Sequence, residues 1–293
     1  MSTRPILTTA GGGLKPFRSR AMRSWTGRIG AAIVIVLVLV AAIGPLVAPY
    51  SPTAIVGIPY QAPSGRFLLG TDSLGRDVLS RVLYGGRTVI GLASVATLMA
   101  YLVGVTIGLI AGYRRGLTDA TLMRAMDVVI AFPPILLLLV LATGAGANAL
   151  VLVIGVAITH VPGIARVVRA ATLDVSVRGY VEAAAARGER SGFILGREIL
   201  PNISSTILAD VGIRLSGSIL LVASVNYLGL GLRPPTADWA LMISENREAL
   251  TTQPPAVVVP ALLIAALTIA VNLVADAVAR SFGTSVEERG VAR

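Results

Sequence analysis

The sequence predicts an all-α polytopic membrane protein with about six transmembrane helices and short cytoplasmic helices between two of them. Of its 293 residues, 55% are hydrophobic and only 14% are charged, whereas a soluble domain carries about 25% charged residues. The hydrophobic residues are mostly aliphatic and fall into six runs. Each run approaches the ~20 residues that a helix needs to cross the hydrocarbon core. Because backbone groups in lipid must be hydrogen-bonded internally, runs of this length predict helices.

The six apolar runs are separated by polar loops. The first run follows several arginines, as in a signal peptide, but its length favours an anchor that is retained. The third run contains Pro133 and Pro134, which predict a kink or break, and we expect residues 122–126 to join it. The runs cover residues 29–48, 88–112, 127–143, 149–168, 203–228 and 256–278.

Basic residues predict the orientation, because they are retained on the cytoplasmic side of a membrane. With the N-terminus in the cytoplasm, 18 arginines and lysines fall in cytoplasmic segments and 6 in outside loops. Both termini are therefore expected in the cytoplasm. We expect a cytoplasmic tail over residues 1–25, a transmembrane domain over 26–282 and a second cytoplasmic tail over 283–293.

Composition excludes several function classes. The net charge of +10 is spread between the apolar runs, which favours a membrane protein over a nucleic-acid-binding one. The absence of cysteine excludes disulfides, thiolate metal sites and cysteine nucleophiles. The only lysine, Lys15, lies between Leu14 and Pro16, which excludes a phosphate-binding P-loop. With one histidine and no clustered acids, we predict no catalytic residue and no metal site.

The longest cytoplasmic loop covers residues 169–202. A helix is expected from Tyr180 to Arg187, where helix formers are frequent, and Gly188 is typical of a helix C-terminus. A second short helix is expected over 191–199, and Pro201 suits the first turn of the fifth span. From the residues alone, this loop is either a plain surface loop or a rigid knob for a soluble partner.

Two outer segments also carry distinctive residues. Before the second span, Asp72, Arg76 and Asp77 could form a charge cluster that either fixes the loop or meets a partner protein. After the fifth span, a short interfacial helix is expected over residues 236–250. Trp239 is expected at headgroup depth, where tryptophan is enriched.

Asp210 and Arg214 are ionisable residues inside the fifth span, spaced as a helical ion pair. Each charge would cost roughly 2.5 to 3.5 kcal/mol at the bilayer centre. We therefore expect them to pair and to face protein or water, either as a structural pair or as part of a transport pathway. His160, in the fourth span, is expected to pack between helices.

The cytoplasmic loop resembles the EAA loop of the membrane subunits of ATP-binding-cassette importers. The resemblance rests on Glu182-Ala183-Ala184, on Gly188 six residues after the glutamate, and on Leu200-Pro201. Glu198 departs from the isoleucine usual in that family. Two outer segments are similar to signatures of the second permease of dipeptide and oligopeptide importers, with departures at Val222, Asn226 and Tyr227. Their matching residues are Leu69, Gly70, Thr71, Asp72, Gly75, Arg76, Asp77, Ser80 and Arg81 before the second span, and residues 228–231, Pro234, Pro235, Thr236 and Trp239 after the fifth.

The resemblance, which covers about residues 25–282, implies a permease subunit of a peptide importer in the bacterial inner membrane. It implies three kinds of partner besides lipid: a second permease, two ATPase subunits that bind ATP and Mg²⁺, and an extracytoplasmic substrate-binding protein. No cofactor is expected in this chain. The same subfamily includes permeases for nickel, glutathione and haem, and a secondary transporter or a membrane enzyme is less well supported. The residues implied in coupling to the ATPase are Tyr180, Glu182, Ala183, Ala184, Gly188, Leu200 and Pro201.

Overall fold

The structure is a computed structural model in which residues 24–291 are described, with side chains described up to Ser281. Within this part every regular element is helical. Five helices are long and apolar enough to cross a membrane, and a bent pair makes up to six spans, which confirms the predicted fold class. The elements are α2 (Trp25–Val47), α3 (Val78–Arg114), α4 (Gly116–Ile130), α5 (Pro134–Ala145), α6 (Ala149–Ser176), α7 (Gly179–Ala186), α8 (Ser191–Phe193), a π-helix (Ile194–Ile199), α9 (Leu200–Tyr227), α10 (Trp239–Asn246), a 3-10 turn (Arg247–Ala249) and α11 (Pro255–Val291).

Several helices extend beyond the apolar runs. Helix α3 begins ten residues before the second run, and α6 continues to Ser176, so that the cytoplasmic loop is shorter than the predicted 169–202. Helix α11 continues to Val291, so residues 283–291 prolong the last span as a helix. The predicted tail over residues 1–25 lies outside the described residues except for Ser24 and Trp25.

The two central helices, α3 and α6, are held together by a stripe of glycines on α3. A Cβ atom at Gly104 would lie 2.8 Å from the Ile164 side chain, and one at Gly108 would lie 2.6 Å from the Ala165 carbonyl oxygen. Gly112 makes an equally close approach to Thr172. Small residues spaced by four let membrane helices approach closely, so this stripe sets the spacing of the bundle.

The third span is broken where the two prolines predicted it. Helices α4 and α5 meet at an angle of 83° across a short break. Pro134 occupies the first turn of α5, where its missing N–H leaves no helical hydrogen bond unmade.

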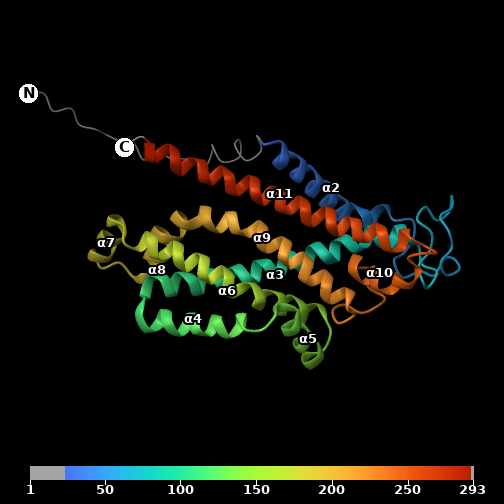
Figure 1. Ribbon diagram of the computed structural model, residues 1–293, viewed down its shortest axis with the longest axis horizontal. Helices are drawn as coiled ribbons and strands as arrows, with labels where there is room; N and C mark the ends of the chain where they lie inside the picture. The colour runs from blue at the N-terminus through green and yellow to red at the C-terminus, as the bar shows by residue number, and fades with distance from the viewer. Residues whose placement is uncertain (1–23, 292–293) are drawn as a thin grey trace, which may run out of the picture.

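The bundle is elongated, with different elements at its two ends (Figure 1). Helices α7 and α8 lie at the end toward which α11 finishes. Helix α10 and the loop between α2 and α3 lie at the opposite end. The two sets of distinctive residues are therefore separated by the full length of the bundle, as the predicted topology requires.

Candidate functional site

Helix α7 ends in a Schellman motif built around Gly188. The Glu189 N–H donates to the Ala184 carbonyl at 3.2 Å, and the Gly188 N–H donates to the Ala185 carbonyl at 3.0 Å; these two bonds define the motif. Gly188 has a φ of +78°, a conformation that glycine adopts without a Cβ penalty. The prediction that Gly188 ends this helix is confirmed.

One face of α7 is anchored and the other is exposed. Val181 and Ala184 are buried, in the same apolar cluster as Ile194 and Ile199 of the π-helix. The opposite face is open and lies at the end of the molecule (Figure 1). Its small alanines allow another protein to approach the backbone closely. The exposed residues are Gly179, Tyr180, Glu182, Ala183, Ala185, Ala186 and Arg187.

The segment after α7 is continuous with the fifth span. Residues Ser191–Tyr227 form one run of 37 helical residues, so the helix expected over 191–199 is present but continues into the fifth span without a break. The helix continues because the segment Ile194–Ile199 widens into a π-helix, in which the Leu200 N–H reaches the Leu195 carbonyl. Pro201, which has no N–H to donate, follows directly in the first turn of α9. Helix α7 therefore packs on a segment that continues into α9.

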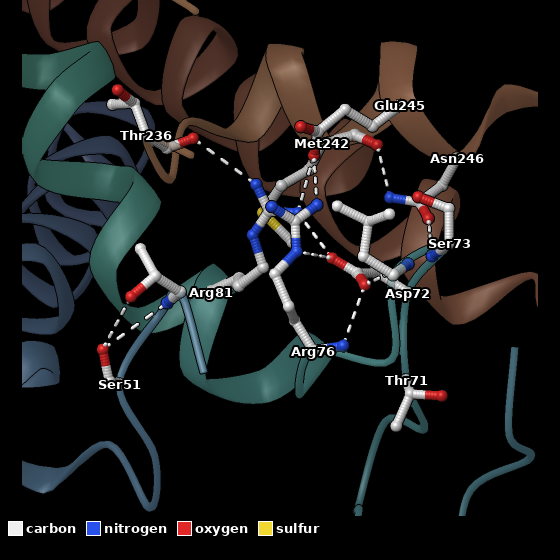
Figure 2. A network of polar contacts seen from close by, with 12 residues as sticks. Ser51, Thr71, Asp72, Ser73, Arg76, Arg81, Thr236, Met242, Glu245 and Asn246 are labelled. Atoms are coloured by element: carbon white, nitrogen blue, oxygen red, sulfur yellow. Dashed lines mark hydrogen bonds and ion pairs between the residues drawn. The ribbon is translucent and has the colours of Figure 1, made fainter. Parts of the chain in front are cut away.

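At the opposite end, four charged side chains form a network that we call the outer clamp: the buried Asp72, Arg76 and Arg81, and the partly buried Glu245 (Figure 2). Asp72 Oδ2 accepts hydrogen bonds from Arg76 Nε and Arg81 Nη1, both at 2.6 Å. Glu245 Oε2 on α10 accepts from Arg76 Nη2 at 3.0 Å and from Arg81 Nη1 at 2.6 Å. Asp72 and Arg81 have no exposed surface and Arg76 is 2% exposed. The network therefore ties the α2–α3 loop to α10, and its guanidinium groups do not face outward.

Two more signature residues shape this loop and its junction with α3. Thr71 Oγ1 donates to the Ile58 carbonyl at 2.6 Å and accepts from the Gln61 N–H at 2.8 Å. Asp77 caps α3, because its Oδ2 accepts from the Ser80 N–H at 2.8 Å. A capping carboxylate also interacts favourably with the helix dipole. This cap explains why α3 begins well before the apolar run.

The two signature glycines take conformations that other residues avoid. Gly70 and Gly75 have φ values of +74° and +76°. A Cβ at Gly70 would lie 1.7 Å from Gln253 Nε2, and one at Gly75 would lie 2.2 Å from the Gly57 carbonyl oxygen. Both positions therefore require glycine for space as well as for backbone conformation.

Trp239 is buried inside the protein, so the prediction that it faces the lipid headgroups is wrong. Its side chain has no exposed surface, and its Nε1 donates to the Val82 carbonyl at 2.8 Å. Gly85 and Gly86 of α3 make the slot for the ring, since a Cβ at either position would lie within 2.8 Å of it. The predicted short helix itself is confirmed as α10.

Sequence reasoning missed three polar residues at this end. Glu245 completes the outer clamp, and Asn246 accepts from the Ser73 N–H at 2.9 Å. Asp238 caps α10 through its Oδ1, which accepts from two backbone N–H groups of the first turn. Burial raises the pKa of Asp238 to about 6, although those N–H groups and the charge of Arg81 oppose the shift. An aspartate directly before a helix is a capping signal, but nothing in the sequence pairs Glu245 with residues more than 160 positions away.

The predicted ion pair in the fifth span is present. Arg214 Nε donates to Asp210 Oδ2 at 3.1 Å, and the same oxygen accepts from Tyr101 Oη at 2.8 Å. The side chains of Arg214 and Asp210 are 23% and 14% exposed, so the pair lies against the protein, as predicted. No group of three or more His, Asp or Glu side chains among the described residues could hold a metal ion.

Comparison with known proteins identifies the same family as the motifs. Residues 104–287 match the family of binding-protein-dependent transport system inner membrane components, and residues 15–64 match the N-terminal transmembrane domain of oligopeptide transport permease C.

Individual relatives agree with these family matches. The chain is 37% identical to the glutathione transport system permease protein GsiD of Pectobacterium atrosepticum over 74% of this chain and 72% of that one. It is 30% identical to the dipeptide transport system permease protein DppC of Haemophilus influenzae over 85% of this chain and 86% of that one.

A solved structure confirms the fold. A chain of the inward-facing MetNI methionine ABC transporter matches with a TM-score of 0.52 and 18% identity, over 67% of this chain and 95% of that one. At this identity the match shows the fold alone. The chain therefore belongs to the binding-protein-dependent inner membrane components, the non-catalytic, multi-pass permease subunits of bacterial ABC importers, and to the oligopeptide permease C type among them.

Proposed function

We propose that this chain, together with a second permease subunit, forms the pathway through which di- and oligopeptides enter the cell. Two ATPase subunits, which bind ATP and Mg²⁺, would drive the transport, and an extracytoplasmic binding protein would deliver the substrate. The relatives named for dipeptide and glutathione transport support a substrate with a peptide backbone. Glutathione, itself a tripeptide, is the alternative substrate.

The observation that carries this proposal is the construction of α7. It is a short helix with one buried face, an exposed alanine face and a fixed C-terminal turn. It packs on a π-helix that is continuous with α9. A coupling helix built in this way would transmit the movement of a soluble partner to a membrane span. We infer that Tyr180, Glu182, Ala183 and Gly188 contact the ATPase. The buried Ala184 would anchor α7 beneath this surface, while Leu200 and Pro201 would connect it to the span.

The remaining assignments follow from this role. The end that carries α7 would face the cytoplasm, because the ATPase acts there, and both termini would lie on that side of the inner membrane. Residues 26–282 would form the permease domain. The outer clamp and α10 would close the opposite end, where the binding protein docks. Asp210 and Arg214 would line the pathway between the two ends.

The test uses three variants at two exposed glycines, Gly188 and Gly192. Each variant is assembled into the full transporter in proteoliposomes. Gly188→Val places a β-branched residue in a left-handed conformation that it avoids. Gly188→Asn serves as the conservative variant, because asparagine tolerates this conformation. Gly192→Val is the position control, because Gly192 is exposed, helical and has no atoms near its Cβ position.

Only Gly188→Val is expected to uncouple the transporter. It should hydrolyse ATP without peptide uptake, or bind the ATPase subunits weakly, while the two other variants transport near the wild-type rate. Equal peptide uptake by all three variants at equal expression would show that α7 is not the coupling element.

A further inference from the structure

The polar triad inside the bundle, Tyr101, Asp210 and Arg214, leaves part of its hydrogen-bonding capacity unused. Asp210 Oδ2 accepts both hydrogen bonds of the triad, from Tyr101 Oη and Arg214 Nε. Among the described residues, Asp210 Oδ1 and the two Nη atoms of Arg214 make no hydrogen bond. A guanidinium has five N–H donors and a carboxylate accepts at both oxygens. The pair therefore keeps a free acceptor and free donors next to each other.

The guanidinium of Arg214 lies against the backbone of α6. A Cβ at Gly163 would lie 2.5 Å from Arg214 Nη1 and 2.8 Å from Nη2, so a larger residue there would displace the group. The triad thus draws on three spans, with Tyr101 from α3, Gly163 from α6 and the ion pair from α9. A site held from three helices is pre-organised, which lowers the entropy cost of binding a ligand.

One member of the triad, Tyr101, lines a groove between α3 and α9. The groove has a volume of about 630 Å³ and its lining residues include Leu98, Tyr101, Val211 and Leu215. Tyr101 belongs to both the groove and the triad, while Val211 and Leu215 neighbour Asp210 and Arg214 along α9. No charged residue lines the groove itself. A ligand lying in it would meet mostly apolar walls and Tyr101, whose Oη is hydrogen-bonded to Asp210.

We propose that Asp210 and Arg214 form a binding point for zwitterionic peptides, which rests on the proposed transport function. The peptide carboxylate would bind the Nη atoms of Arg214, and the peptide ammonium group would bind Asp210 Oδ1. Charge balance favours this ligand. The pair is neutral, so a zwitterion adds no net charge to a low-dielectric site, whereas a simple anion or cation would leave one charge unbalanced.

The experiment measures ligand binding in the absence of the binding protein. Because the chain has no cysteine, Leu98→Cys introduces the only thiol of this subunit, at a residue of the groove that is 61% exposed. The purified transporter complex is treated with a maleimide, and labelling of this subunit is followed with trialanine as the probe. N-acetyl-trialanine amide, which lacks both charges, is the matched control. At twice its dissociation constant trialanine should slow labelling about threefold, and the blocked peptide should not.

A neutral double variant separates this inference from a structural role of the pair. Asp210→Asn with Arg214→Gln keeps hydrogen-bonding groups at both positions and should lose the protection by trialanine. Equal protection by trialanine and the blocked peptide, no protection by either, or full protection in the double variant would each overturn the inference. ATP-driven peptide uptake by the wild-type complex in the same preparation tests the transport function separately. Uptake without charge-dependent protection would refute only the binding point.

Discussion

Replacing Asp72 by asparagine should open the outer clamp. The substitution keeps the shape of the side chain, and an amide oxygen can still accept from the Leu74 and Arg76 N–H groups, which lie 2.9 Å from Asp72 Oδ1. It removes the negative charge that two buried guanidinium groups share. Glu245 would then be the only carboxylate left in the clamp to balance both of them.

The expected magnitude follows from burial. Breaking a buried ion pair by removing one partner costs about 3 to 5 kcal/mol, because the other charge stays desolvated. Since about 1.4 kcal/mol corresponds to a factor of ten, this cost increases the equilibrium constant for the release of α10 roughly 10²- to 10⁴-fold. Exposed ion pairs contribute only about 0 to 1 kcal/mol, so the effect depends on the clamp being closed to water.

Trp239 provides the assay. The chain has two tryptophans, and Trp25→Phe removes the exposed one, leaving the buried Trp239 as a reporter of α10. In Asp72→Asn, the Trp239 emission should shift to the red at a lower temperature than the loss of helical circular dichroism. The exposed Asp174 provides a control, since Asp174→Asn should leave both transitions unchanged. Coincident, wild-type transitions in Asp72→Asn would refute the argument.

Three further outcomes are expected. Burial raises the pKa of Asp238 from 3.8 to about 6, so the folded protein binds the proton of the Asp238 carboxyl group more tightly than the unfolded chain does. The stability of the outer end should therefore fall as pH rises from about 4 to 6. Asp238→Asn should remove this pH dependence of the Trp239 transition. Gly108→Leu should prevent the close packing of α3 on α6 and destabilise the protein by about 1 to 3 kcal/mol or more. The effect should be seen as a loss of monodisperse protein in size-exclusion chromatography. Gly91→Leu should cause no such loss, because there is open space at its Cβ position. In intact spheroplasts, cysteine at the exposed Thr251 should react with an impermeant thiol reagent and cysteine at the exposed Ser191 should not; the reverse pattern would contradict the orientation.

Local sequence signals predicted the fold. Apolar length identified the spans, and the paired prolines located the break between α4 and α5. Gly188 ended α7 because glycine alone takes its conformation at no cost. These features depend on a few neighbouring residues and are therefore readable from the sequence.

Features that depend on distant partners were not readable. Trp239 looked like a headgroup anchor because the sequence does not show that Gly85 and Gly86 leave a slot for its ring. The i,i+4 spacing paired Asp210 with Arg214, but nothing pointed to Tyr101 on another span. The π-helix before Pro201 was missed because its width depends on how the turn packs and bonds, which residue propensities do not describe.

The central claim, that this chain is a transport subunit driven by partner ATPases, is tested most directly by ATP hydrolysis and peptide uptake in one preparation. The tagged chain would be purified from bacterial membranes, both alone and with the proteins that it retains, and each sample reconstituted into liposomes. The chain alone should hydrolyse no ATP, while the complex should contain ATPase subunits and take up trialanine only when ATP and its binding protein are present. ATP hydrolysis by the isolated chain, or uptake by the isolated chain driven by an ion gradient, would contradict this account.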